Sequence, residues 1–142
     1  MITDSSFAIN CGGSKTITAS DGTVYEIDNA TVTTASYHVT DTTNWGVSSV
    51  GSFADSPDAN YIISILSQFE NTLDPELFQT ARLSPSSLRY YGIGLQNGNY
   101  TVKLQFAETA YLNPPSWKSV GRRVFDIYIQ VRELDVPHPK LH

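Results

Sequence analysis

Residues 97–108 read NGNYTVKLQFAE, the stretch that decides the fold class predicted for this sequence. Polar and apolar side chains alternate through YTVKLQF. Because successive side chains of a strand point to opposite faces, one face would collect the apolar residues while the other meets water, as is usual in antiparallel sheets. Asn97 and Gly98 form a strong hairpin-turn signal, since both tolerate positive φ. The stretch therefore predicts a strand over residues 100–107, paired with a strand within residues 87–95.

The composition is that of one small domain rich in strands and turns. The chain has 142 residues, and only 16% of them are charged, against roughly 25% in an average soluble protein. Its net charge of −5 argues against a nucleic-acid partner, because phosphate binding needs clustered Lys and Arg. The longest apolar run, residues 61–66, is far shorter than the roughly 20 residues that cross a bilayer, so no membrane span is expected.

The N-terminal sequence and two sequons bear on where the protein works. The first residues, MITD, lack the basic and apolar regions of a secretory signal, so the sequence is that of a cytosolic protein or of an internal piece of a longer one. Asn29-Ala30-Thr31 and Asn99-Tyr100-Thr101 both match the N-glycosylation pattern. The predicted alternation places Asn99 on the wet face, where a glycan fits. Asn29 and Asn99 are therefore candidate glycosylation sites, and a plain hairpin asparagine is the alternative at Asn99.

Strand signals recur along the chain, separated by Gly, Asn, Asp, Ser and Pro, which is typical of an all-β sandwich. Residues 36–60 are polar and broken by glycine and proline, and we expect long irregular loops there. Asp74-Pro75-Glu76 has the form of a helix start, but Ser84-Pro85 ends any helix within about two turns, so a strand is predicted instead. The predicted strands are residues 7–10, 24–27, 77–81, 88–91, 100–107 and 124–131.

The sequence contains few residues suited to catalysis or metal binding. Phosphate-binding, C-x-x-C, H-E-x-x-H and G-x-S-x-G motifs do not occur. His38 has no metal-ligand spacing around it, so we expect no metal site and no cofactor. Cys11, the single cysteine, is interpreted as a free thiol, as half of a bridge to a partner outside the chain, or as a small buried hydrophobe. No base is identified that would activate it.

Two carboxylates raise the possibility of a glycoside-cleaving enzyme. Glu108 and Asp126 lie on predicted neighbouring strands and match the residue types of a glycosidase pair. Pairing of Glu108 with Arg122 or Arg123 is the favoured interpretation, and an enzyme ranks last among the functions considered.

Aromatic residues are the better functional candidates. Their faces suit the apolar C–H faces of sugar rings, while neighbouring hydrogen-bonding groups suit the hydroxyl rim. Most aromatic residues on strands belong to a core. Tyr37 and Trp45 fall in the predicted loops and are therefore candidate carbohydrate-binding residues.

A series of motifs, in order along the chain, resembles the malectin domain found outside the membrane in plant leucine-rich-repeat receptor-like kinases. The resemblance covers residues 7–130 and leaves residues 1–6 as an N-terminal segment and residues 131–142 as a divergent tail, with the C-terminal strands of the family domain missing. The motifs are FAINCGG (7–13), LFQTAR (77–82), LRYYG (88–92), NYTV (99–102), LQFAE (104–108) and GRRVFDI (121–127).

The resemblance implies a jelly-roll-like β-sandwich on the extracellular face of the plasma membrane, as part of a longer receptor. It implies a noncatalytic module, not an enzyme, which binds glucose-type or cell-wall oligosaccharides. Tyr25 matches a ligand-binding tyrosine of the family, Phe78 stands where the family has another tyrosine, and Tyr111 keeps one of two neighbouring aromatic positions. The family's acidic ligand residue would lie beyond this chain. The alternative is a module that contacts a co-receptor or a peptide and binds no sugar.

Overall fold

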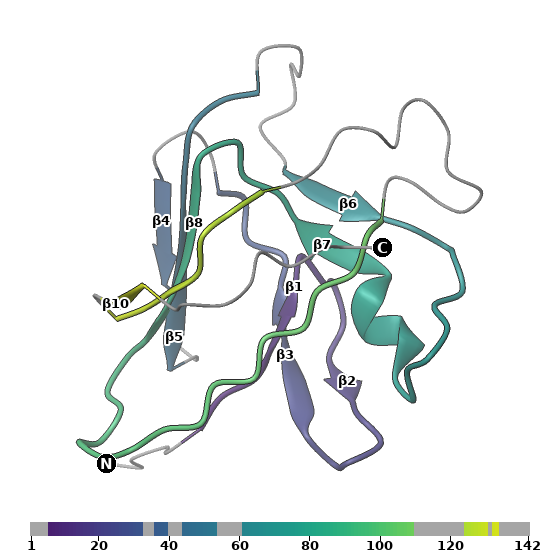
Figure 1. The fold of residues 1–142 in the computed structure, drawn as a ribbon, viewed down its shortest axis with the longest axis horizontal. Helices are drawn as coiled ribbons and strands as arrows, with labels where there is room; N and C mark the ends of the chain where they lie inside the picture. Colours follow the sequence, from purple (N-terminus) through teal and green to yellow (C-terminus); the bar gives the residue numbers. More distant parts are fainter. Residues whose placement is uncertain are drawn as a thin grey trace. The chain divides into compact units, whose positions relative to one another are not determined.

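The computed structural model describes residues 6–32, 36–39, 44–53, 61–109, 124–130 and 132–133. The chain divides into two compact units, Met1–Thr101 and Val102–His142, and each is described by itself. Regular structure in the described residues consists of short β-strands and one 3-10 helix, η1 (Pro75–Phe78) (Figure 1). The prediction of an all-β fold is confirmed. In the part of the chain that the structure describes, no helix is long and apolar enough to cross a membrane.

One sheet of the first unit has the order β1-β3-β2. β3 (Val24–Asp28) lies between β1 (Ile9–Cys11), which runs parallel to it, and β2 (Ile17–Thr18), which runs antiparallel. A tight turn joins β2 to β3, in which Gly22 adopts a φ of +83°, a conformation that glycine reaches without strain. The predicted strands over residues 7–10 and 24–27 overlap β1 and β3.

A second sheet, with the order β4-β5-β8, contains the core of this unit. β5 (Trp45–Val50) is paired antiparallel with β4 (Ser36–Val39) on one side and with β8 (Ser87–Gly92) on the other. Alternate residues of β5 point inward, and Trp45 and Val47 are only 3% and 0% exposed. The prediction of irregular loops over residues 36–60 is therefore wrong for β4 and β5. Gly46, Ser48 and Ser49 of β5 are residue types that predict a loop, but their small side chains also suit a central strand that packs closely on both sides.

A third pairing joins β6 (Ile62–Ser64) to β7 (Thr80–Arg82) in antiparallel orientation. η1 directly precedes β7 and begins at Pro75, where proline costs little because the amide at a helix start lacks an intrahelical acceptor. The strand predicted over residues 77–81 is therefore only partly correct, since the helix-start signal prevails up to Phe78 and the strand begins at Thr80.

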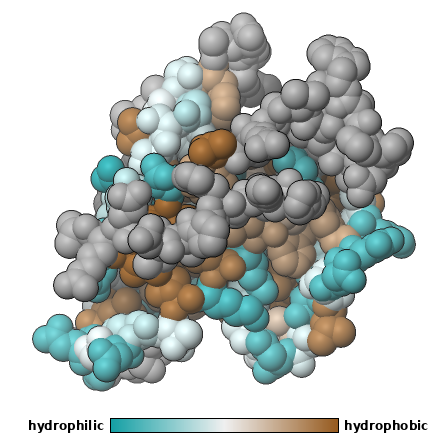
Figure 2. Space-filling model, viewed as in Figure 1, coloured by the Kyte–Doolittle hydropathy of each residue, from teal (hydrophilic) through white to brown (hydrophobic). Residues whose placement is uncertain are grey.

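The hairpin predicted from residues 97–108 does not form among the described residues. Residues 100–109 belong to no strand, and neither Asn97 nor Gly98 has positive φ. The apolar side chains of the stretch are 42–49% exposed, and hydrophobic residues reach the molecular surface in Figure 2. Alternation alone does not make a strand, because the backbone also needs a hydrogen-bonded neighbour along its length.

The described residues of the second unit include one small antiparallel pair. β9 (Tyr128–Ile129) is paired with β10 (Arg132–Glu133). Residues 124–130 alternate between exposed and half-buried, with Phe125 and Ile127 on the half-buried side. The Phe125 ring contacts the ring of Phe106, with 5.3 Å between centroids. The remainder of the strand predicted over residues 124–131 is not regular in the described residues.

Candidate functional site

A buried ion pair lies beneath the surface of the first unit. Asp28, at the end of β3, is 1% exposed and accepts two hydrogen bonds from Arg82 of β7: Nε to Oδ2 at 2.8 Å and Nη2 to Oδ1 at 2.6 Å. Such two-point contacts combine charge with fixed geometry. Arg82 Nη2 also donates to the carbonyl oxygens of Asp28 and Ala30, at 3.2 and 2.9 Å. β7 and the segment after β3 are therefore held together at this point.

Two further groups complete the environment of the Asp28 carboxylate. The Tyr90 hydroxyl of β8 donates to Oδ2 at 2.7 Å, and the Gly12 amide donates to the same oxygen at 3.1 Å. Burial raises the pKa of the Tyr90 hydroxyl, and neighbouring Cys11 and Asp28 raise it further. Burial also raises the pKa of the Cys11 thiol. Both groups are therefore protonated at neutral pH, and Cys11 is unsuited to nucleophilic attack.

This network explains why three of the motifs occur together in one chain. FAINCGG supplies Cys11 and Gly12, LFQTAR supplies Arg82, and LRYYG supplies Tyr90. All three meet around Asp28, which no motif had identified. Among the described residues, Arg82 Nη1 is a buried donor without an acceptor. Gly12, Arg82 and Tyr90 of these motifs therefore stabilise the fold through a buried network.

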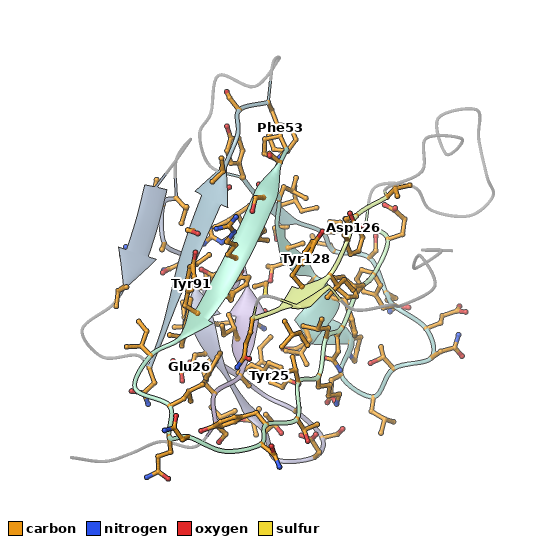
Figure 3. All side chains as sticks on the ribbon, turned by 60° about the vertical axis from the view of Figure 1, so that its left-hand side comes forward. Tyr25, Glu26, Phe53, Tyr91, Asp126 and Tyr128 are labelled. Atoms are coloured by element: carbon orange, nitrogen blue, oxygen red, sulfur yellow. The ribbon has the colours of Figure 1, made fainter. Side chains whose placement is uncertain are left out.

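Side chains of β3 and of the residues that follow it alternate between two rows, judged by their exposure. Glu26, Asp28 and Val32 belong to the inner row, and the Glu26 carboxylate accepts a 2.8 Å hydrogen bond from Trp45 Nε1. Tyr25 is half-buried and belongs to the other row, which we call the outer β3 row (Figure 3). The members of the outer β3 row are Tyr25, Ile27, Asn29 and Thr31, and the last three are exposed.

Polar contacts place η1 beside the strand next to Tyr25. Lys15 Nζ lies 2.9 Å from Glu76 Oε2, and the Ser20 amide and hydroxyl donate to Asp74 at 2.6 and 3.0 Å. Lys15 and Ser20 flank β2, so η1 lies alongside β2 (Figure 1). Tyr25 is paired with Ile17 of β2, the strand that lies alongside η1, and Phe78 is the last residue of η1.

The other predicted carbohydrate-binding residues lie elsewhere. Phe78 is half-buried and its ring contacts Phe69, with 5.7 Å between centroids. Trp45 lies in the core, with 6.0 Å between the centroids of its ring and that of Tyr90. Because only 3% of Trp45 is exposed, it presents little surface to a ligand. Tyr37 lies in β4, opposite Ser48, and not in a loop. Tyr111 lies outside the described residues.

Asn29 and Asn99 are both exposed. Arg122 and Arg123, which were proposed to pair with Glu108, lie outside the described residues. Among the side chains that the structure describes, no cluster of three or more His, Cys, Asp or Glu could hold a metal ion.

Tyr91 is an exposed aromatic residue that the sequence analysis did not select as a candidate. Tyr91 of β8 is 39% exposed and its hydroxyl lies 3.3 Å from the hydroxyl of Ser48. That hydrogen bond and neighbouring Arg89 lower the pKa of the Tyr91 hydroxyl. The signal was present in LRYYG, where two consecutive tyrosines of a strand must face opposite ways, one inward and one outward.

Comparisons with known proteins agree on one family. Residues 5–136 match the family model described as the malectin domain. Two Arabidopsis thaliana proteins, each named a probable LRR receptor-like serine/threonine-protein kinase, are 52% identical to the chain over 130 residues, or 90% of its length. A third Arabidopsis thaliana protein with this description, RFK1, is 40% identical over 126 residues, or 86% of the chain. The chain spans 12% of the length of these relatives. No solved structure is a significant match.

The names of these relatives correct one expectation. The chain was expected not to be an enzyme, with any kinase activity belonging to a longer parent protein, whereas the relatives that it matches are themselves named serine/threonine-protein kinases. The family match covers the malectin domain alone. The kinase designation describes proteins about eight times longer than the matched segment, since that segment is 12% of their length.

Proposed function

The chain belongs to the malectin-domain family, and on this premise we propose that it is a carbohydrate-binding module in the extracellular part of a receptor-like kinase. The proposed ligands are glucose-type or cell-wall oligosaccharides. The receptor-like kinase names of the relatives support the extracellular setting. The domain is proposed to occupy residues 7–130, with a divergent tail over residues 131–142.

The position of Tyr25 is the observation that carries this proposal. Its ring is half-buried on a strand that is hydrogen-bonded on both sides, so the exposed part of the ring is held in place. A sugar ring can stack its apolar face on such an aromatic ring. η1, alongside β2, brings Phe78 and the polar groups of Asp74 and Ser20 to the same part of the unit. An aromatic platform near hydrogen-bonding groups is the combination that sugar recognition requires.

A protein-binding or peptide-binding module is the second candidate. Phe78 lacks the hydroxyl of the family tyrosine, and an unpaired sugar hydroxyl at a buried contact costs about 1 to 3 kcal/mol. Val24 and Ile27 of β3 are 54% and 40% exposed, and exposed apolar side chains suit a protein partner. These observations favour a co-receptor or peptide ligand over sugar.

Calorimetric titration distinguishes the two candidates. We expect saturable binding of a glucose disaccharide or a cell-wall oligosaccharide by the wild-type chain, weakened roughly tenfold in Tyr25→Ala, a loss of about 1.4 kcal/mol. Phe78→Ala and Tyr111→Ala should weaken binding as well, and Tyr37→Ala tests the remaining candidate. Tyr91→Ala is the matched control, because it removes an exposed tyrosine from a different sheet. Absence of sugar binding together with capture of a receptor ectodomain would favour the protein-binding candidate.

A further inference from the structure

We propose that Asn29 carries an N-linked glycan whose first sugars lie along the outer β3 row, over Ile27 and toward Tyr25. This inference rests on the proposed extracellular setting, because N-glycosylation takes place in the secretory pathway. It extends the proposed function by placing a covalently attached saccharide next to the proposed binding residue.

The two side chains that define the sequon, those of Asn29 and Thr31, are both exposed to solvent. Asn29 and Thr31 are exposed, whereas Asp28 and Val32 on either side are buried at 1% exposure each. The Ala30 carbonyl between them accepts a hydrogen bond from Arg82 Nη2 at 2.9 Å. The backbone of the sequon is therefore anchored from within. A glycan on Asn29 would project outward and would leave the buried network intact.

The modification itself is a transfer from a lipid-linked oligosaccharide diphosphate, which the secretory pathway supplies. The Asn29 side-chain nitrogen, Nδ2, forms a bond to C1 of the first sugar. The bond between C1 and the diphosphate oxygen breaks, Nδ2 loses one proton, and the lipid diphosphate leaves with the bonding electron pair. The remaining N–H of Nδ2 stays available as a donor.

The outer β3 row gives the attached sugars an apolar surface to cover. Residues two apart on a strand share a face and lie about 6.6 Å from each other, and residues four apart lie about 13 Å from each other. Asn29 is exposed and directly follows the last residue of β3, so the proposal places its first sugar beside Ile27 and the following sugars toward Tyr25. Ile27 is an exposed apolar side chain, 40% accessible, on an otherwise well-paired strand. Covering it with the C–H face of a sugar removes apolar surface from water.

Occupancy is tested by secreting the chain from a eukaryotic cell with an added signal sequence and analysing its peptides by mass spectrometry. The peptide that contains Asn29 should carry a glycan that peptide N-glycosidase removes. Asn29→Gln and Thr31→Ala should each abolish that glycoform. Asn99→Gln is the matched control and should leave it in place. An unmodified Asn29 in the secreted protein would overturn the inference.

Packing along the row is tested by comparing the melting temperature of the glycosylated chain with that of the unglycosylated chain made in bacteria. The glycan should raise Tm in the wild-type protein, and Ile27→Thr should remove most of that rise. Val24→Thr is the matched control, because Val24 is exposed on the same strand but lies on the opposite face from Ile27. An equal rise in Tm in both variants would overturn the packing arrangement.

The same pair of preparations separates this inference from the proposed function. If the glycan covers Tyr25, the unglycosylated chain should bind an added glucose disaccharide more tightly than the glycosylated chain. If neither preparation binds sugar while the Asn29 peptide is glycosylated, the proposed carbohydrate-binding function fails and the modification site stands. If both bind equally, the glycan does not reach Tyr25.

Discussion

Replacement of Arg82 by methionine tests the role of the buried ion pair most severely. Arg82→Met keeps an unbranched side chain of similar length but removes both hydrogen bonds to the Asp28 carboxylate, at 2.8 and 2.6 Å. Among the described residues, Asp28 would retain only the Tyr90 hydroxyl and the Gly12 amide as donors. A buried charge that loses its partner destabilises a protein by about 3–5 kcal/mol. We expect a loss of about 4 kcal/mol, a large part of the roughly 5–15 kcal/mol that holds a domain folded.

Urea denaturation followed by circular dichroism measures this loss, and thermal unfolding should show a fall in Tm of about 16 °C, at roughly 4 °C per kcal/mol. Tyr90→Phe is a milder variant, which removes one hydrogen bond to the carboxylate and should cost about 2 kcal/mol. Lys15→Met is the matched control, since the Lys15–Glu76 pair is exposed and should be worth at most about 1 kcal/mol.

A double variant separates charge pairing from simple loss of packing. Asp28→Asn removes the uncompensated charge while leaving an oxygen that accepts from Tyr90 and Gly12. Combined with Arg82→Met, it should cost less than the sum of the two single substitutions. If Arg82→Met costs no more than Lys15→Met, or if the two substitutions at positions 28 and 82 are additive, the ion pair does not hold β3 and β7 together as described.

Two further predictions concern pH and backbone conformation. The pKa values of Cys11 and Tyr90 are raised in the folded chain, so the unfolded chain loses these protons at lower pH, near its pKa values of about 9 for Cys11 and about 10 for Tyr90. The free energy of unfolding should therefore be highest at neutral pH and should fall as the pH rises above these two values. Urea titrations at increasing pH would show this decline, and Tyr90→Phe should flatten it; an unchanged slope would contradict the assignment. Gly12→Ala should cost about 1–3 kcal/mol, because Gly12 has a φ of +73° and a Cβ there would lie 2.9 Å from the Ala81 carbonyl carbon. Gly22→Ala, with a φ of +83° and open space around it, should cost less in the same denaturation assay, and equal costs would refute the close approach to β7.

The fold class and some strands could be predicted because local pattern and tertiary pairing agree there. β3 and β8 are nearly the strands expected from VYEI and LRYY. β5 was missed, because Gly46 and the serines that let it pack closely between two neighbours are the residues that mark loops in a single sequence. Residues 100–107 show the opposite error, since clear alternation was not accompanied by backbone pairing in the described residues.

The candidate site was less accessible to sequence reasoning than the fold. Asp28 reads as a surface residue in VYEID, and its burial depends on Arg82, which lies 54 residues further along the chain. Trp45 was expected near a loop rim, but its indole N–H is satisfied by Glu26 inside the unit. Such long-range partners leave no periodic signal. Tyr25 could be selected only through the family resemblance. The position of η1 beside β2 depends on contacts of Lys15 and Ser20 that sequence spacing does not reveal.

Chemical-shift mapping by NMR tests the central proposal most directly, because it reports where a sugar binds as well as whether it binds. Titration of the unglycosylated chain with a glucose disaccharide or a cell-wall oligosaccharide should shift the resonances of Tyr25, Ile27 and the residues of η1, with saturation at high ligand concentration. The resonances of β8 around Tyr91 should stay in place. Saturable shifts confined to β8, or no shifts with any of these saccharides, would contradict a carbohydrate site on the outer β3 row.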